Sequence, residues 1–242
     1  MHGFGKRILL SLTAAVLLAA CTGAGDEGEG AKLSPQDAGK AAAMLHDYEA
    51  ARTAGNPEAA EVAADTLRER FPDSAEATQL ESTLEAVRKD AEAVRETRRL
   101  RGLWDYQANA VGNGTQRSAS IFSRTVDLGE DQPAPIPDAQ LVLRDHPDWG
   151  RSAYLLLAAP KFSCGKPCTL QLAFDAGAPE TWRGKQADSG KGPALFIEDE
   201  ARFITALRAA KQLRVLLPKG SGSIGSLVFE VGGFSPERYA SP

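Results

Sequence analysis

Cys164 and Cys168 are the residues of this sequence whose type and spacing most directly suggest chemistry. They enclose Gly165-Lys166-Pro167 in the stretch FSCGKPCTL. This C-x-x-x-C spacing differs from the C-x-x-C of thioredoxin-like redox motifs, and the chain has no second cysteine pair to complete a four-ligand zinc site. The choice among a redox couple, a metal site and a structural disulfide depends on the compartment in which the chain folds.

The N-terminus indicates that compartment. Lys6 and Arg7 precede an uncharged apolar run, residues 8–20, of about 13 residues. The run has the features of a secretory signal and is too short for a transmembrane helix, which needs about 20 residues. It ends in Leu18-Ala19-Ala20-Cys21, which resembles the lipobox of bacterial lipoproteins. The resemblance implies that residues 1–20 are a lipoprotein signal peptide; the alternative is an ordinary signal with an incidental cysteine.

In proteins with a lipobox, the cysteine is acylated and becomes the mature N-terminus, so the resemblance makes Cys21 the expected lipidation site. Two or more acyl chains give stable membrane anchoring. Thr22, and not Asp, follows Cys21. By the sorting of such lipoproteins, this implies the outer membrane, with the protein facing the periplasm.

Acylation of Cys21 would leave Cys164 and Cys168 as an even pair in an oxidising compartment. The flanking segments, 153–162 and 169–174, have the composition of strands, so the sequence predicts a hairpin with a three-residue loop. Residues opposite one another on antiparallel strands have Cα atoms about 4.5–5.5 Å apart, which is within disulfide range. We therefore expect a structural disulfide in preference to a redox or metal function.

Composition limits the classes of partner. The chain is 43% hydrophobic and 25% charged, as in globular proteins, and loss of Lys6 and Arg7 with the signal leaves 26 basic and 32 acidic residues, a net charge of −6. An acidic chain of this kind is a poor partner for nucleic acid. Nothing in the sequence suggests a cofactor.

Residues for catalysis are few. Beyond the signal, the histidines are His46, within a predicted helix, and His146, in the turn-like stretch LRDHPDWGR. Asp145 or Asp148 could orient the His146 imidazole, but the stretch is also typical of a turn between strands. The acids 198–200 are typical of a helix N-terminus. The segment KGSGSIGS lacks both the G-x-S-x-G pattern and a phosphate-binding loop.

Residues 21–33 are rich in Gly and acidic residues and predict a disordered tether. Residues 34–101 form a predicted helical segment, with helices starting at Ser34-Pro35, at Pro57 and at Asp73 or Ser74. The stretch RERFPDSAEA resembles boundaries between tetratricopeptide repeats, but only about one and a half repeats fit. The prediction is a helical hairpin or three-helix unit, which serves as a spacer or a docking seam. The arginines of VRETRRLRG are expected to complement the helix dipole; the alternative is an anion or lipid-headgroup patch.

From Leu103 the apolar period changes to two, which predicts a strand-rich domain over residues 102–242. Many short strands and one helix, residues 198–212, favour a mainly antiparallel β-sandwich or flattened barrel. The fold class expected for the whole chain is therefore α+β. A polar loop is expected over 177–192, with Trp182 within it.

The C-terminal stretch ARFITALRAAKQLRVLLPKGSGSIGSLVFEVGGFSPERY resembles the end of periplasmic β-sandwich proteins of the invasion-associated locus B family. Accessory lipoproteins of type VI secretion clusters end similarly. The shared pattern is a short helix, a strand, a glycine hairpin and a strand that terminates in Gly-Phe, here Gly233-Phe234. The resemblance implies a non-enzymatic envelope module.

These observations predict a lipid-anchored module that binds an envelope protein or polymer and is not an enzyme. Trp149 and Trp182 are the candidate binding residues, because aromatic side chains in polar loops are common anchors. The alternatives are an envelope hydrolase or sugar-processing enzyme that uses scattered carboxylates, and a secretion-system assembly factor.

Overall fold

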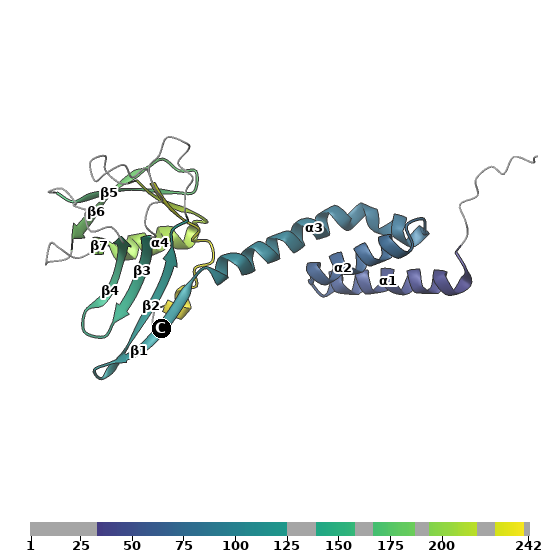
Figure 1. Cartoon of the computed structure of the whole chain (residues 1–242), viewed down its shortest axis with the longest axis horizontal. Helices are drawn as coiled ribbons and strands as arrows, with labels where there is room; N and C mark the ends of the chain where they lie inside the picture. The colour runs from purple at the N-terminus through teal and green to yellow at the C-terminus, as the bar shows by residue number, and fades with distance from the viewer. Residues whose placement is uncertain (1–32, 125–138, 158–166, 187–193, 217–225, 240–242) are drawn as a thin grey trace, which may run out of the picture.

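The computed structural model describes residues 33–124, 139–157, 167–186, 194–216 and 226–239. Within these ranges the fold is α+β, as predicted: a unit of three helices leads into one curled antiparallel sheet of nine strands (Figure 1). The elements are α1 (Pro35–Thr53), α2 (Pro57–Arg70), α3 (Ala75–Gly102), β1 (Asp105–Val111), β2 (Gly114–Phe122), β3 (Ala139–His146), β4 (Gly150–Leu157), β5 (Thr169–Phe174), β6 (Glu180–Gln186), β7 (Ala194–Ile197), α4 (Glu200–Ala209), β8 (Leu213–Leu216), β9 (Ser226–Phe229) and α5 (Pro236–Tyr239).

The three N-terminal helices begin within a residue or two of the positions that the sequence predicts, and each has a capping side chain. The side chains of Ser34, Asn56 and Ser74 each accept a hydrogen bond from a backbone N–H two or three residues into the helix. Such a bond satisfies one of the donors that the first turn leaves unpaired. Proline occupies the first position of α1 and of α2, where its missing N–H costs nothing.

Apolar packing holds the helices together. The buried residues of α3 are alternately three and four positions apart, which places them on one side of the helix, and this side packs on α2. Tyr48 of α1 is 1% exposed, and its hydroxyl lies 2.6 Å from Thr83 Oγ1 of α3. This is a hydrogen bond between the first and third helices of the unit.

The arginines near the C-terminus of α3 form ion pairs. Arg95 lies 2.5 Å from Glu61 of α2, and Arg98 hydrogen-bonds to Glu58. Arg98 thereby holds the pKa of Glu58 below its ordinary value. Arg99 contacts Glu96 on its own helix and Glu230 beyond β9. With their charges neutralised by these partners, Arg95, Arg98 and Arg99 do not form a free anion-binding patch.

The strand order of the sheet is β1-β2-β3-β4-β7-β6-β5-β8-β9, and every neighbouring pair is antiparallel. An isolated bridge between Arg124 and Val228 joins the chain just after β2 to β9. The sheet therefore curls back toward itself as a half-barrel, which matches the flattened-barrel form of the prediction and differs from two stacked sheets.

The predicted cysteine hairpin is wrong in its strand pairing. β4 pairs with β3 and β7, whereas β5 pairs with β6 and β8, so two strands separate β4 from β5 in the sheet. Proximity in the sequence did not determine pairing here, because β7 returns from further along the chain to pair with β4. Cys164 lies outside the described residues, so the Cys164–Cys168 disulfide stays a prediction that rests on compartment and cysteine count.

One face of the sheet carries the core. Helix α4 lies inside the curl (Figure 1), where Phe203 and Leu207 are fully buried against alternate residues of the strands. Asp199 caps this helix by accepting a hydrogen bond from the Arg202 N–H, which confirms the capping interpretation of this acid. We call the opposite side of the strands, represented by Val142, Arg144, Tyr154 and Phe196, the outer face.

The last turn of α3 is fixed to the sheet by a close backbone contact. A Cβ atom added to Gly233 would lie 2.2 Å from the carbonyl carbon of Leu100, so only glycine fits at this position without a shift. Next to this contact, the Trp104 ring packs 5.0 Å from the Phe234 ring. The helical unit and the sheet therefore meet through the Gly-Gly-Phe stretch after β9.

Candidate functional site

Trp149 lies at the tip of the β3–β4 hairpin and is 70% exposed. His146 pairs with Gly150 across the strands, so the loop between them has three residues, 147–149. Gly150 has a φ of +68°, a backbone conformation that glycine adopts without strain and that is typical of three-residue hairpin loops. The turn thus presents a large aromatic side chain on a short loop.

The exposed indole is held in place by His146. The two rings are stacked, with centroids 3.9 Å apart and an interplanar angle of 14°, and His146 itself is 4% exposed. His146 Nδ1 accepts a hydrogen bond from the Asp148 backbone N–H at 3.1 Å. No described carboxylate hydrogen-bonds to this imidazole, and Asp145 pairs with Arg151. His146 therefore serves the turn and supports Trp149.

A cation and two further aromatic rings continue from Trp149 along the outer face. The guanidinium carbon of Arg144 lies 5.3 Å from the Trp149 ring centroid and 5.5 Å from that of Tyr154. The Tyr154 ring lies 5.2 Å from Phe196 on β7. Burial raises the pKa of the Tyr154 hydroxyl, so it stays protonated at neutral pH. Together these side chains form a connected row of an indole, a guanidinium, a phenol and a phenyl ring across three strands.

Sequence reasoning missed Arg144, Tyr154 and Phe196. The available signal was strand alternation, because in LVLRDH the residues Val142, Arg144 and His146 share one side of β3. Which residues of β4 and β7 lie beside them depends on strand pairing, which the sequence did not reveal.

Trp182 does not lie in a polar loop, and that prediction is wrong. It belongs to β6 and is 2% exposed. Its ring packs edge-on against that of Phe203, with the ring centroids 6.0 Å apart. Its polar neighbours Thr181 and Arg183 lie on the other side of the strand, so the local sequence appears loop-like although its one large apolar side chain points into the core. A direct binding role for Trp182 is inconsistent with this burial.

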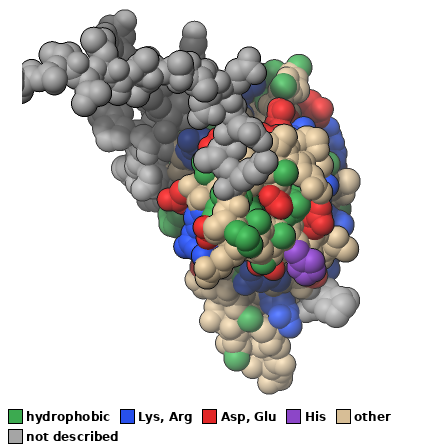
Figure 2. Space-filling view, turned by 90° about the vertical axis from the view of Figure 1, so that its right-hand side faces the viewer, with side chains coloured by type: hydrophobic (Ala, Val, Ile, Leu, Met, Phe, Trp, Pro, Cys, Tyr) green, Lys and Arg blue, Asp and Glu red, His purple; other side chains and the backbone are tan. Residues whose placement is uncertain are grey.

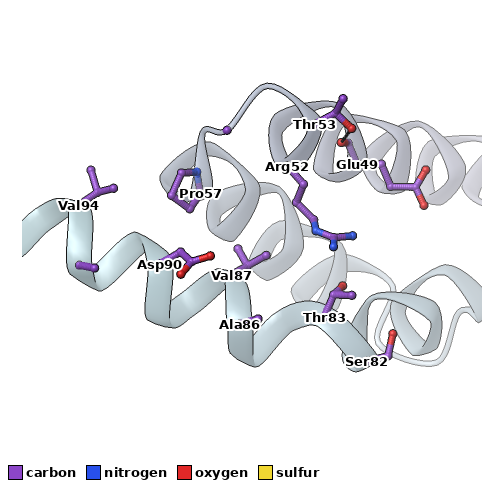
Figure 3. Close-up of a pocket in the computed structure, with 12 residues that line it drawn as sticks. Glu49, Arg52, Thr53, Pro57, Ser82, Thr83, Ala86, Val87, Asp90 and Val94 are labelled. Atoms are coloured by element: carbon purple, nitrogen blue, oxygen red, sulfur yellow. Dashed lines mark hydrogen bonds between the residues drawn. The ribbon is translucent and has the colours of Figure 1, made fainter.

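A groove of about 940 Å³ runs between α1 and α3 (Figure 3). Arg52 reaches into it from α1, and its guanidinium carbon lies 5.4 Å from the Tyr48 ring. Ala86, Asp90 and Val94 line the opposite wall on α3. No ion pair found within the described ranges includes Arg52 or Asp90. The groove is open and mixed in polarity, and no aromatic residue is among its lining side chains, so it offers no anchor comparable to Trp149.

The end of the helical unit remote from the sheet shows hydrophobic side chains gathered near its centre, with acidic side chains among them (Figure 2). Leu33, where the described chain begins, is 36% exposed. His46 of α1 has a side chain that is 81% exposed. It is therefore a solvated surface histidine.

The other predicted sites are those for lipidation, for the disulfide and for metal binding. Cys21, the signal peptide and the KGSGSIGS stretch lie outside them, while Cys168 lies just before β5. Within the part of the chain that the structure describes, no group of three His, Cys, Asp or Glu side chains could hold a metal ion. None of the helices there is long and apolar enough to cross a membrane.

Comparisons of the chain with protein-family models, with curated proteins and with solved structures found no match.

Proposed function

We propose that this protein is a non-catalytic binding module of the bacterial envelope. In this proposal, acylated Cys21 anchors it in the outer membrane, facing the periplasm, and the hairpin tip at Trp149 captures an envelope protein or polymer. One observation carries the proposal: Trp149 is 70% exposed and yet is fixed by stacking on His146. A large aromatic side chain that is already ordered loses little entropy when it is covered, which is the property of a binding anchor.

The arrangement of the elements supports this function. Helix α1 begins at the end of the helical unit that is remote from the sheet (Figure 1). Helix α3 has 28 residues and leads from that end to the sheet; at 1.5 Å per residue it is about 42 Å long. An anchor that precedes α1 would therefore hold the hairpin tip away from the membrane surface.

Capture by Trp149 is tested by chemical crosslinking in cells that carry the full chain. We expect a specific crosslinked species that Trp149→Ala removes. The matched control is Val62→Ala, because Val62 of α2 is 67% exposed and lies away from the tip. Both variants should melt within a few degrees of the unaltered protein. Retention of the crosslinked species by Trp149→Ala would contradict the proposal.

Anchoring and the absence of catalysis have separate tests. Cys21→Ser should release the protein from the outer-membrane fraction, and the unaltered protein should incorporate labelled palmitate. Purified protein should not turn over peptidoglycan, ester or peptide substrates. Turnover that His146→Ala eliminates would favour the hydrolase alternative, because His146 would then be a catalytic group and not a support for Trp149.

A further inference from the structure

Two neighbouring residues on β3 and β4 each have a buried polar atom on the outer face without a hydrogen-bond partner. They are Arg144, at its Nε atom, and Ser152, at its Oγ atom. The two residues are directly opposite one another on β3 and β4. Folded proteins rarely leave buried donors unpaired, and a missing water, ion or ligand commonly explains those that are. Arg144 belongs to the row of side chains that begins at Trp149, and Ser152 lies two residues before Tyr154 on β4.

Among the described residues, Arg144 also has no carboxylate partner. None of the ion pairs among the described residues includes it, although it is partly exposed and lies near two aromatic rings. Arg202 provides a comparison within the same molecule. Its guanidinium carbon lies 3.9 Å from the Trp182 ring centroid, and it also contacts Glu180 at 2.8 Å. Arg202 is thus a stacked arginine with a carboxylate, and Arg144 is a stacked arginine without one.

We propose that the outer face beside Trp149 binds a carboxylate that is carried next to an aromatic or apolar group. Arg144 supplies the positive charge through its guanidinium group, and Trp149 supplies the surface for the apolar group. Guanidinium and carboxylate are well matched in charge and geometry, and hydrogen bonds between ionised groups are stronger than neutral ones. This inference rests on the proposed function, because it takes Trp149 as the anchor.

The surroundings of Arg144 favour an acidic peptide segment of a protein partner over a glycan. Val142, Tyr154, Leu156 and Phe196 follow on the same face, and their side chains are apolar or aromatic. Phe122, at the end of β2, is 60% exposed. Hydrophobic side chains of a peptide can pack on such a surface while a carboxylate of the same peptide pairs with Arg144.

The probe for this inference is N-acetyl-phenylalanine, with N-acetyl-phenylalaninamide as its uncharged match. Binding is followed by tryptophan fluorescence of the intact mature protein. Trp104 and Trp182 are 5% and 2% exposed, so a change in quenching reports mainly on Trp149. We expect saturable binding of the acid, with binding of the amide about tenfold weaker or less, because a hydrogen-bonded charge pair is lost. Added salt should weaken binding of the acid.

Variants separate the roles of the side chains. Arg144→Gln should weaken binding of the acid about tenfold or more and leave binding of the amide unchanged. Arg144→Lys, which keeps the positive charge but loses the planar pair of donors, should weaken binding of the acid to a smaller extent and serves as the second variant if Arg144→Gln does not fold. Arg202→Gln is the matched control and should leave the affinity unchanged.

The inference is overturned if the acid does not bind, or if acid and amide bind equally. It is also overturned if a purified disaccharide-peptide fragment of peptidoglycan binds through Arg144 more tightly than peptides do, since the partner would then be the wall polymer. In the crosslinking test, loss of the species with Trp149→Ala but not with Arg144→Gln leaves the proposed function intact and refutes the carboxylate site. Retention with both variants refutes both.

Discussion

Gly233→Ala tests whether the contact between α3 and the sheet determines the stability of the fold. The added Cβ would lie 2.2 Å from Leu100 C, 2.3 Å from Leu100 O and 2.4 Å from Arg101 N. All three are backbone atoms of the last turns of α3, so no side-chain rotation can relieve the overlap. Either the helix end or the Gly-Gly-Phe stretch must move.

The expected cost follows from the nature of those atoms. Overpacking in a well-packed region typically costs about 1–3 kcal/mol, and a clash with helix backbone belongs at the upper end of that range. For a domain of about 200 residues, each kcal/mol lowers the melting temperature by about 2–4 °C, so we expect a decrease of about 6–12 °C. The displacement should also loosen the packing of Trp104 on Phe234.

The measurement is thermal unfolding followed by near-ultraviolet circular dichroism, in which buried Trp104 reports on the joint. The control is Gly39→Ala, the same chemical change at an exposed position of α1 with nothing within 4 Å of the added carbon. That substitution should stabilise the helix by about 0.5–1 kcal/mol. The prediction is wrong if Gly233→Ala has the melting temperature of the unaltered protein while Gly39→Ala raises it as expected. The close contact between α3 and the sheet would then not determine stability.

Three further predictions concern packing, a buried hydrogen bond and pH. Trp182→Ala should destabilise the protein by about 3–5 kcal/mol in urea unfolding because it empties a core site, whereas Trp149→Ala should change stability little; similar values for the two would contradict their assigned burial. Tyr48→Phe should cost about 1 kcal/mol in the same assay by removing the hydrogen bond to Thr83, and an unchanged midpoint would show that this bond contributes nothing. Burial and then the Glu200 carboxylate raise the pKa of Tyr239, so the folded state retains this proton more tightly than the unfolded state does. Stability should therefore fall as the pH rises above the ordinary tyrosine pKa of about 10, and Tyr239→Phe should reduce that slope in urea unfolding across the alkaline range.

The helical unit could be predicted because its signals are local. Ser34, Asn56 and Ser74 cap helices through side chains that reach only a few residues along the chain. The buried residues of α3 are likewise only three or four positions apart in the sequence. The alternation that marks strands is local in the same way, so the α+β class followed from the sequence.

The order of the strands could not be predicted, because pairing is a contact between distant segments. β4 and β5 are consecutive in sequence, and each has a better partner elsewhere in the sheet. The burial of Trp182 has the same origin, since Phe203, which packs against it, comes from a helix about twenty residues later. At the candidate site, the turn sequence around Trp149 is a local signal. The neighbours Tyr154 and Phe196 became visible only with the register of β3, β4 and β7.

The position of the hairpin tip relative to the helical unit depends on the C-terminal end of α3, where the helix leaves its contacts with α2 and meets the residues that follow β9. Arg98 pairs with Glu58 at the start of α2, and the next residue, Arg99, pairs with Glu230 beside the sheet. Exposed ion pairs contribute little net stability, so the close backbone packing of Gly233 on Leu100 is the stronger restraint on the end of the helix. A bend at this joint would have to break the ion pair at Arg99 and open the contact at Gly233 together. The three helices and the sheet are therefore expected to move as one body when a ligand binds at Trp149.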